Sequence, residues 1–262
     1  MAEVVILDSP KTIASLAADA VVSLLADKPT AVLGLATGSS PLALYDELVR
    51  RHRAGEVSFA RAKAFMLDEY VGLSDSHPER YRNVIEREIA SRVDFEPGAV
   101  AGPDGNAADL KAACAAYEEA IRAAGGIDLQ ILGIGSDGHI AFNEPSSSLS
   151  SRTRIKTLTQ QTIADNARFF GGDEAAVPRH VLTQGLGTIM EARHLVLMAL
   201  GRSKAEAVHQ MLEGGVSALW PASIIQFHPH ATVLLDTGAA SRLQLTSYYR
   251  HVYAGKPAWQ QL

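Results

Sequence analysis

Two acidic side chains and one histidine lie close enough in the sequence to act together in proton transfer. Asp137, His139 and Glu144 fall within eight positions of one another, in a segment that also holds three glycines. Two carboxylates near one imidazole can orient the ring and raise its proton affinity, so His139 could donate and accept protons near neutral pH. A metal site built from the same residue types, or a polar turn without a chemical role, is the alternative.

A second pair of acids, Asp68 and Glu69, ends the apolar run 62–67. Successive side chains near the end of a strand point to opposite sides, so we expect only one of the two to face a ligand crevice. Partial burial beside apolar surface would raise the proton affinity of that carboxylate and make it a better base. The alternative is an acid that starts a helix or forms a salt bridge.

Two further segments are suited to an anion. One is a hydroxyl-rich turn before a helical pattern, made of Thr37, Gly38, Ser39 and Ser40. Backbone N–H groups at the start of a helix bind phosphate, although no Gly-Lys-Ser/Thr sequence comes next as in a nucleotide-binding P-loop. Lys204 is expected in the first turn of another helix, where a cation opposes the helix dipole and therefore favours an anionic ligand. An ordinary capped turn and a surface lysine are the alternatives.

The elements that must position these residues alternate along the chain. Short apolar runs of strand length lie at 4–7, 31–36, 62–67, 129–132, 194–200 and 231–235. Helical patterns lie at 11–26, 42–53, 78–92, 107–124, 178–190 and 204–212. This alternation predicts an α/β fold with a doubly wound, mostly parallel sheet and helices on both faces, in a single domain over residues 1–262. In such folds ligands bind beyond the carboxyl ends of the strands, where the candidate residues stand.

The bulk composition limits the classes of partner. The 262 residues carry a net charge of -5 and no long basic block, which argues against nucleic acid. No apolar stretch reaches the roughly 18 residues that a membrane span needs, and no leader segment is evident, so we expect a cytoplasmic protein. Cys114 is the single cysteine, so no disulfide can form within the chain. Residues 157–177 have weak periodicity and an adjacent glycine pair, and are predicted to form a lid.

Taken together, these segments resemble the glucosamine-6-phosphate deaminase family. The most specific matches are Leu35–Pro41, Leu67–Leu73 and Gly133–Pro145, with further ones at Ser151–Lys156, Asn166–Phe170 and Gly201–Ala205. The resemblance runs from Val32 to about Tyr249 and is weak at both ends of the chain. It implies a Rossmann-like fold and a hydrolase that converts glucosamine 6-phosphate to fructose 6-phosphate and ammonia, in N-acetylglucosamine catabolism. It implies no organic cofactor and no metal.

The resemblance also implies roles for single residues. Asp68 is similar to the base that moves a proton between C2 and C1 of the sugar, and His139 to the group that opens the ring, with Asp137 and Glu144 as its partners. The positions that match the phosphate-binding residues are Thr37, Gly38, Ser39, Ser40, Arg168 and Lys204. The positions that match a site for the allosteric activator N-acetylglucosamine 6-phosphate are Ser147, Arg154 and Lys156.

Two alternatives to this function remain. A 6-phosphogluconolactonase has a similar Gly-x-Asp-Gly-His segment, but lactone hydrolysis needs neither a C2 base nor ring opening. A non-catalytic sugar-phosphate sensor of a transcription regulator would carry a helix-turn-helix domain and could lose the catalytic acids. Members of the resembling family occur as monomers and as hexamers, and nothing in the sequence decides between a monomer and a homo-oligomer.

Overall fold

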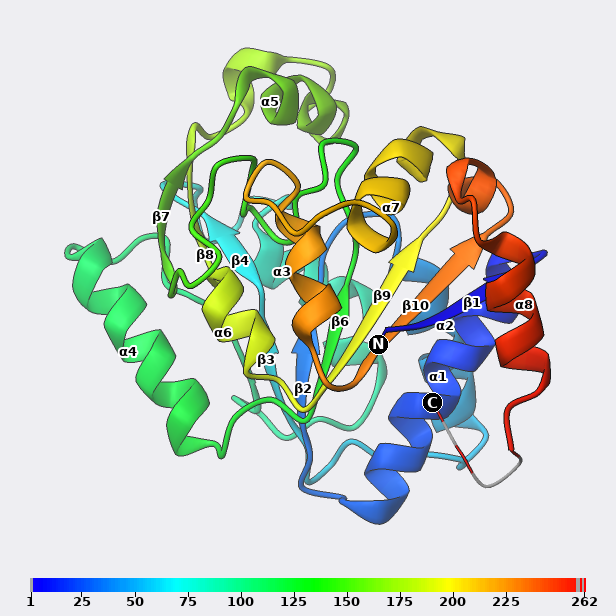
Figure 1. The fold of residues 1–262 in the computed structure, drawn as a ribbon. Helices are drawn as coiled ribbons and strands as arrows, with labels where there is room; N and C mark the ends of the chain where they lie inside the picture. Colours follow the sequence, from blue (N-terminus) through cyan, green and yellow to red (C-terminus); the bar gives the residue numbers. More distant parts are fainter. Residues whose placement is uncertain (1, 258–259, 261) are drawn as a thin grey trace.

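A parallel sheet of seven strands forms the centre of the molecule (Figure 1). The computed structural model describes residues 2–257, 260 and 262. The strand order is β1 (Glu3–Leu7), β10 (Ala231–Asp236), β9 (His194–Ala199), β6 (Leu129–Leu132), β2 (Val32–Leu35), β3 (Lys63–Met66) and β5 (Val100–Ala101). Every pairing between neighbours is parallel. The predicted doubly wound α/β sheet is therefore confirmed, and its apolar strands are buried as helix-covered parallel strands should be.

Eight α-helices in the described residues accompany the strands. They are α1 (Pro10–Asp27), α2 (Leu42–Arg53), α3 (Tyr81–Glu88), α4 (Leu110–Ala123), α5 (Gln160–Asn166), α6 (Leu186–Met190), α7 (Ala205–Leu212) and α8 (Thr246–Ala254). Side-chain caps fix where several begin: Ser9 accepts from the N–H of Thr12 at α1, and Asp109 caps α4 in the same way. The helical pattern at 78–92 is shorter than predicted, because α3 ends at Glu88 and a 3-10 turn follows at Ala90–Arg92.

A second, smaller sheet lies beside the first and corrects one prediction. Its three antiparallel strands are β4 (Asp68–Tyr70), β8 (His180–Thr183) and β7 (Arg154–Thr157), in that order. The sequence pattern predicted a helix over 178–190, which is wrong for its first half. Residues 180–183 pair on both sides with β4 and β7, and only α6 is helical. This pairing places Asp68 opposite Thr183 and fixes the position of the strand that carries the acid pair.

Two hydrophobic clusters hold the fold together. The larger one joins both faces of the parallel sheet to α1, α2, α4 and α7. In the smaller one Tyr70 and Phe142 pack with Phe170 and Val177 of the segment 158–177. Figure 1 shows α5 beyond the ends of the small sheet, so this segment lies over the carboxyl ends of the parallel strands. No helix in the described residues has the length and apolarity required to cross a membrane.

Candidate active site

A cavity of about 300 Å³ opens at the carboxyl ends of β2, β3, β6 and β9. Most of the residues predicted to act on a ligand line this one cavity: Thr37, Gly38, Ser39, Ser40, Asp68, His139, Arg168 and Lys204. They come from four strand ends and from the segment after α5, so the parallel sheet gathers residues that are more than 160 positions apart in the chain.

The hydroxyl-rich turn lies between β2 and α2. Gly38 has φ 91°, a left-handed conformation that favours glycine, and this allows the chain to reverse tightly before Leu42 starts the helix. Tyr45 fixes the entry to the turn, because its hydroxyl donates to Ala36 O at 2.7 Å and accepts from Ala36 N at 3.1 Å. The turn therefore presents backbone N–H groups and hydroxyls to the cavity at a helix start, as an anion site requires.

Two cations face the same cavity from other segments. Lys204 ends the 3-10 turn Arg202–Lys204 before α7, and Arg168 lies in a similar turn after α5, with its guanidinium 4.6 Å from the centroid of the Phe169 ring. Burial lowers the pKa of Lys204, the charge of Asp165 raises it, and the charge of Arg168 lowers it further. Two cations that partly repel each other at one cavity wall favour the binding of an anion between them.

Asp68 and Glu69 point to opposite sides of β4, as strand alternation predicts. Asp68 lines the cavity and is 5% exposed, whereas Glu69 turns toward the start of α3. Burial raises the pKa of Asp68 well above its usual range, and the neighbouring charge of Glu69 raises it further. Asp68 is therefore a stronger base than a solvated aspartate once it is ionised.

His139 stands beside Asp137. Nδ1 of the imidazole lies 2.7 Å from Oδ1 of Asp137, an ion-pair distance, and the backbone N–H of His139 donates to the same oxygen. Burial opposes ionisation of Asp137, but these contacts with His139 hold the pKa of the carboxyl below its usual value. The carboxylate therefore fixes the orientation of a ring whose other nitrogen is available to a ligand.

Glu144 is hydrogen-bonded to residues at the start of α5. Its buried carboxylate accepts hydrogen bonds from the N–H and hydroxyl of Thr159 and from the hydroxyl of Thr162, at the start of α5. Among the described residues it has no hydrogen bond with His139. Asp137 thus contacts the imidazole directly, whereas the hydrogen bonds of Glu144 are with Thr159 and Thr162.

The three residues predicted to bind an effector lie outside this cavity. Arg154 and Lys156 are half-buried on one face of β7, and the guanidinium of Arg154 donates to Asn143 Oδ1 at 2.8 Å. Ser147 is buried, and its hydroxyl has no hydrogen-bond partner among the described residues. These residues are near the segment of His139 in sequence, but they do not contribute to the cavity wall.

Several aromatic and amide groups of the cavity were not predicted. Tyr81 and Phe142 line it with parallel rings 6.1 Å apart, and Asn166 donates to the Tyr70 hydroxyl at 2.9 Å. The Tyr81 hydroxyl also contacts that of Tyr70, at 3.3 Å. The aromatic residues belong to β4, α3 and the loop after β6, so they form no periodic pattern that sequence reasoning could detect.

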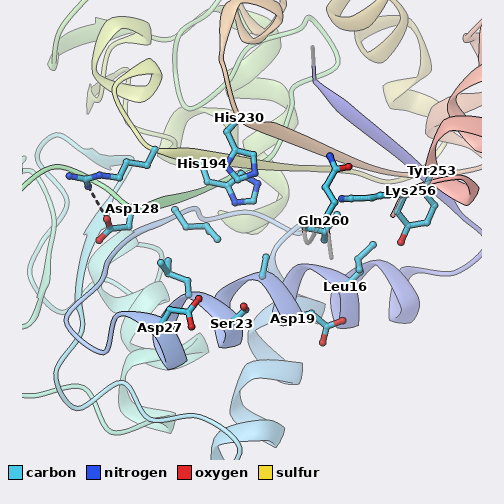
Figure 2. A pocket seen from close by; sticks show the side chains of 15 residues that line it. Leu16, Asp19, Ser23, Asp27, Asp128, His194, His230, Tyr253, Lys256 and Gln260 are labelled. Atoms are coloured by element: carbon cyan, nitrogen blue, oxygen red, sulfur yellow. Dashed lines mark hydrogen bonds and ion pairs between the residues drawn. The ribbon is translucent and has the colours of Figure 1, made fainter. Parts of the chain in front are cut away.

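A second cavity, of about 650 Å³, lies at the amino ends of β6, β9 and β10 (Figure 2). His194 and His230 stack in it with ring centroids 3.6 Å apart. The Nε2 of His228 contacts Ala192 O, and no group of three metal-ligating side chains occurs in the described part of the chain. This cavity shares no residue with the first one.

Comparison with known proteins agrees with the geometry. A family model for glucosamine-6-phosphate isomerases and 6-phosphogluconolactonases matches residues 8–234. A glucosamine-6-phosphate deaminase of Mycolicibacterium smegmatis is 71% identical, covering 98% of this chain and 99% of that protein. Another, of Beutenbergia cavernae, is 69% identical over 99% of this chain and 100% of that protein.

Solved structures give the same result. A monomeric glucosamine-6-phosphate deaminase, 40% identical, superposes with a TM-score of 0.89 over 92% of this chain and 99% of its own. A 6-phosphogluconolactonase from Trypanosoma cruzi, 19% identical, has a TM-score of 0.74 over 93% of this chain and 97% of its own, and shares the fold. The chain therefore belongs to the glucosamine-6-phosphate deaminase family.

Proposed function

We propose that this protein converts glucosamine 6-phosphate to fructose 6-phosphate and ammonia. The observation that carries the proposal is the single cavity at the strand ends, which contains a buried carboxylate, an oriented imidazole and a cationic, hydroxyl-rich wall. An aldose-to-ketose rearrangement of a phosphorylated amino sugar requires these three parts. Family members of 71% and 69% identity that bear the deaminase name support the assignment.

Ring opening is the first step. The cyclic amino sugar has no free carbonyl group, so a proton must be delivered to the ring oxygen while the C1 hydroxyl loses one. His139 serves as this proton shuttle, because Asp137 holds one ring nitrogen and leaves the other toward the cavity. Glu144 acts indirectly in this scheme, through the start of α5 to which it is hydrogen-bonded.

Proton transfer and deamination come next. Asp68 removes the C2 proton of the open chain and returns it to C1, which leaves an imine at C2. Water adds to the imine carbon, ammonia leaves, and the C2 ketone of fructose 6-phosphate remains. A positioned base is typically worth about 10²–10⁴-fold in rate. The phosphate, held by the Thr37–Ser40 turn with Arg168 and Lys204, keeps the chain in register while the sugar reacts.

The decisive assay is ammonia release from glucosamine 6-phosphate by the wild type and by Asp68→Asn. The variant is expected to lose turnover by at least about a hundredfold while it still binds substrate. Equal turnover in the two proteins would remove Asp68 from the mechanism. Lactone hydrolysis, the activity of the distant fold relative, is the control reaction. It needs no C2 base, so activity toward 6-phosphogluconolactone that survives Asp68→Asn would favour a lactonase instead.

The lid and the effector site complete the proposal. Residues 157–177 contribute Thr162, Asn166 and Arg168 to the cavity wall, which supports a lid that closes over substrate. The Ser147 hydroxyl, which has no hydrogen-bond partner in the described part of the chain, and the two cations on one face of β7 support an N-acetylglucosamine 6-phosphate site. We expect that sugar phosphate to activate the wild type but not Lys156→Ala. If the wild type is not activated, the effector site is refuted.

Sedimentation with and without the sugar phosphate distinguishes a monomer from a hexamer.

A further inference from the structure

Glu69 is a buried acid that the reaction scheme above does not use. Its side chain is on the face of β4 opposite Asp68, and the residue is 1% exposed. The carboxylate accepts hydrogen bonds from three backbone N–H groups: Tyr70 at 2.8 Å, Tyr81 at 2.9 Å and Arg82 at 2.9 Å. A solvated surface acid would not need this set of donors, so the site is built to hold a carboxylate at this position.

Two of these donors belong to the first turn of α3. Their N–H groups have no partner within the helix, and an acceptor at a helix start satisfies them while it interacts favourably with the helix dipole. Glu69 thereby joins α3 to β4. Because Tyr81 lines the substrate cavity, this link also sets where the cavity wall stands relative to Asp68.

The same contacts favour a negative charge on Glu69. Burial raises the pKa of Glu69, but the three N–H donors and the Arg80 guanidinium, whose Nε is 3.8 Å from Oε2, oppose that effect. N–H donors stabilise the ionised form because they supply hydrogen bonds that a carboxylate accepts. An ionised Glu69 places a negative charge one residue from the base, on the opposite face of the same strand.

Other titratable groups also face the region of Asp68. Tyr70 on β4, Tyr81 at the start of α3 and Tyr117 on α4 interact with its charge, and their phenols are neutral at physiological pH because burial raises each pKa. The charged or titratable side chains that line the same cavity are Glu79, Arg87, Glu88, His139, Asp165, Arg168 and Lys204. The cations in this set favour ionisation of Asp68, whereas its burial and the negative charge of Glu69 oppose it.

We propose that Glu69 is a positioning residue for the deamination reaction: its charge maintains the basicity of Asp68, and its hydrogen bonds hold α3 and Tyr81 at the cavity wall. The inference rests on the proposed role of Asp68 as the C2 base. Glu69 would have this role although it is buried on the face of β4 opposite Asp68 and does not line the substrate cavity.

The test compares two variants that separate charge from length. Glu69→Gln keeps the chain length and removes the charge, whereas Glu69→Asp keeps the charge and withdraws the carboxylate by one methylene. For each variant kcat/KM for ammonia release is measured against pH, with circular dichroism and a thermal melt to confirm folding. Glu86→Gln, an exposed acid on α3, is the matched control. The phosphate of the substrate titrates identically in every assay. Differences between the pH profiles of the variants and the wild type therefore come from groups of the enzyme.

Glu69→Gln is expected to move the acid limb of the profile about one pH unit toward acid, because Asp68 loses a negative neighbour and stays ionised to lower pH. Glu69→Asp should leave the limb in place and lower kcat instead, since α3 loses its anchor. A limb that stays in place in folded Glu69→Gln, or that moves equally in both variants, would overturn the proposal.

A third variant covers the case in which Glu69→Gln does not fold. Arg80→Gln removes the cation that favours ionisation of Glu69, so the negative charge acting on Asp68 weakens and the acid limb should move toward lower pH; an unchanged limb would refute the charge effect. Failure of the inference is distinguishable from failure of the proposed function. If Asp68→Asn is inactive while Glu69→Gln keeps the wild-type pH profile, Asp68 remains the proposed base and the positioning role of Glu69 is refuted. If Asp68→Asn is active, the reaction scheme itself is wrong.

Discussion

Gly135 provides the space in which the His139 imidazole stands. A Cβ atom added at this position would lie 2.3 Å from Cε1 and 2.4 Å from Nδ1 of the ring, where ordinary contacts begin at 3.4 Å. The N–H of Gly135 donates to His139 O at 2.8 Å, so the two backbones cannot separate to relieve the clash. Gly135→Ala must therefore displace the ring itself, by about 1 Å.

The displacement of the ring has a kinetic consequence. A 1 Å misplacement of a catalytic group costs about 10²-fold, equivalent to roughly 2.7 kcal/mol in the barrier. We expect kcat for ammonia release to fall by about a hundredfold in Gly135→Ala, with a smaller change in KM because the phosphate wall is untouched. The backbone of Gly135 is not in the left-handed region, so the fold itself should tolerate alanine.

Gly215→Ala is the matched control, because a Cβ atom there meets nothing within 4 Å. Its kcat and melting temperature should equal those of the wild type. Stopped assays of ammonia release and a thermal melt on each variant are sufficient. A folded Gly135→Ala protein that retains kcat within about threefold would refute the reasoning, as would a crystal structure of it with the Asp137–His139 contact unchanged.

Three further predictions concern the anion wall, the turn beneath it and the second cavity. Lys204→Ala should raise KM for glucosamine 6-phosphate about tenfold or more with a smaller effect on kcat, since a charge-assisted contact is worth about 1.5–3 kcal/mol; an unchanged KM in steady-state kinetics would exclude it from phosphate binding. Tyr45→Phe leaves both buried backbone groups of Ala36 without their partner, which should lower the free energy of unfolding by about 1–3 kcal/mol in a urea titration. Burial lowers the pKa of His194 from 6.5 to about 3, so below pH 6.5 the unfolded chain takes up a proton that the folded one refuses. Stability should therefore fall between pH 6.5 and 3, by roughly 2–3 kcal/mol at pH 4.5, and His194→Gln should abolish most of that loss in pH-dependent melts.

The parallel sheet and the residues at its edge were predictable from the sequence. Strands that helices cover on both faces have continuous apolar sequences, as at 31–36 and 194–200. The residues that follow the carboxyl end of each run lie at the edge of the sheet where ligands bind. For this reason the sequence alone predicts that Asp68 and His139, which are 71 positions apart, lie at the same edge of the sheet, and both line one cavity.

The small sheet and its consequences were not predictable. β4 has three residues, and β8 has a composition that a helix tolerates equally well, so only pairing with distant strands decides their conformation. The hydrogen bonds of Glu144 with Thr159 and Thr162 at the start of α5 were likewise not predictable, because the two threonines lie 15 and 18 positions further along the chain in a segment of weak periodicity.

The ladder between β7 and β8 has a mechanical consequence for the proposed lid. Thr157 pairs with His180, so the 22 residues between them leave and re-enter the molecule through one antiparallel rung. The same sheet continues into β4, whose first residue is Asp68. Both ends of the proposed lid are thus hydrogen-bonded into the small sheet that carries Asp68. If the lid closes as proposed, its two ends stay at a constant distance, so closure should cost little chain entropy and should leave Asp68 in place.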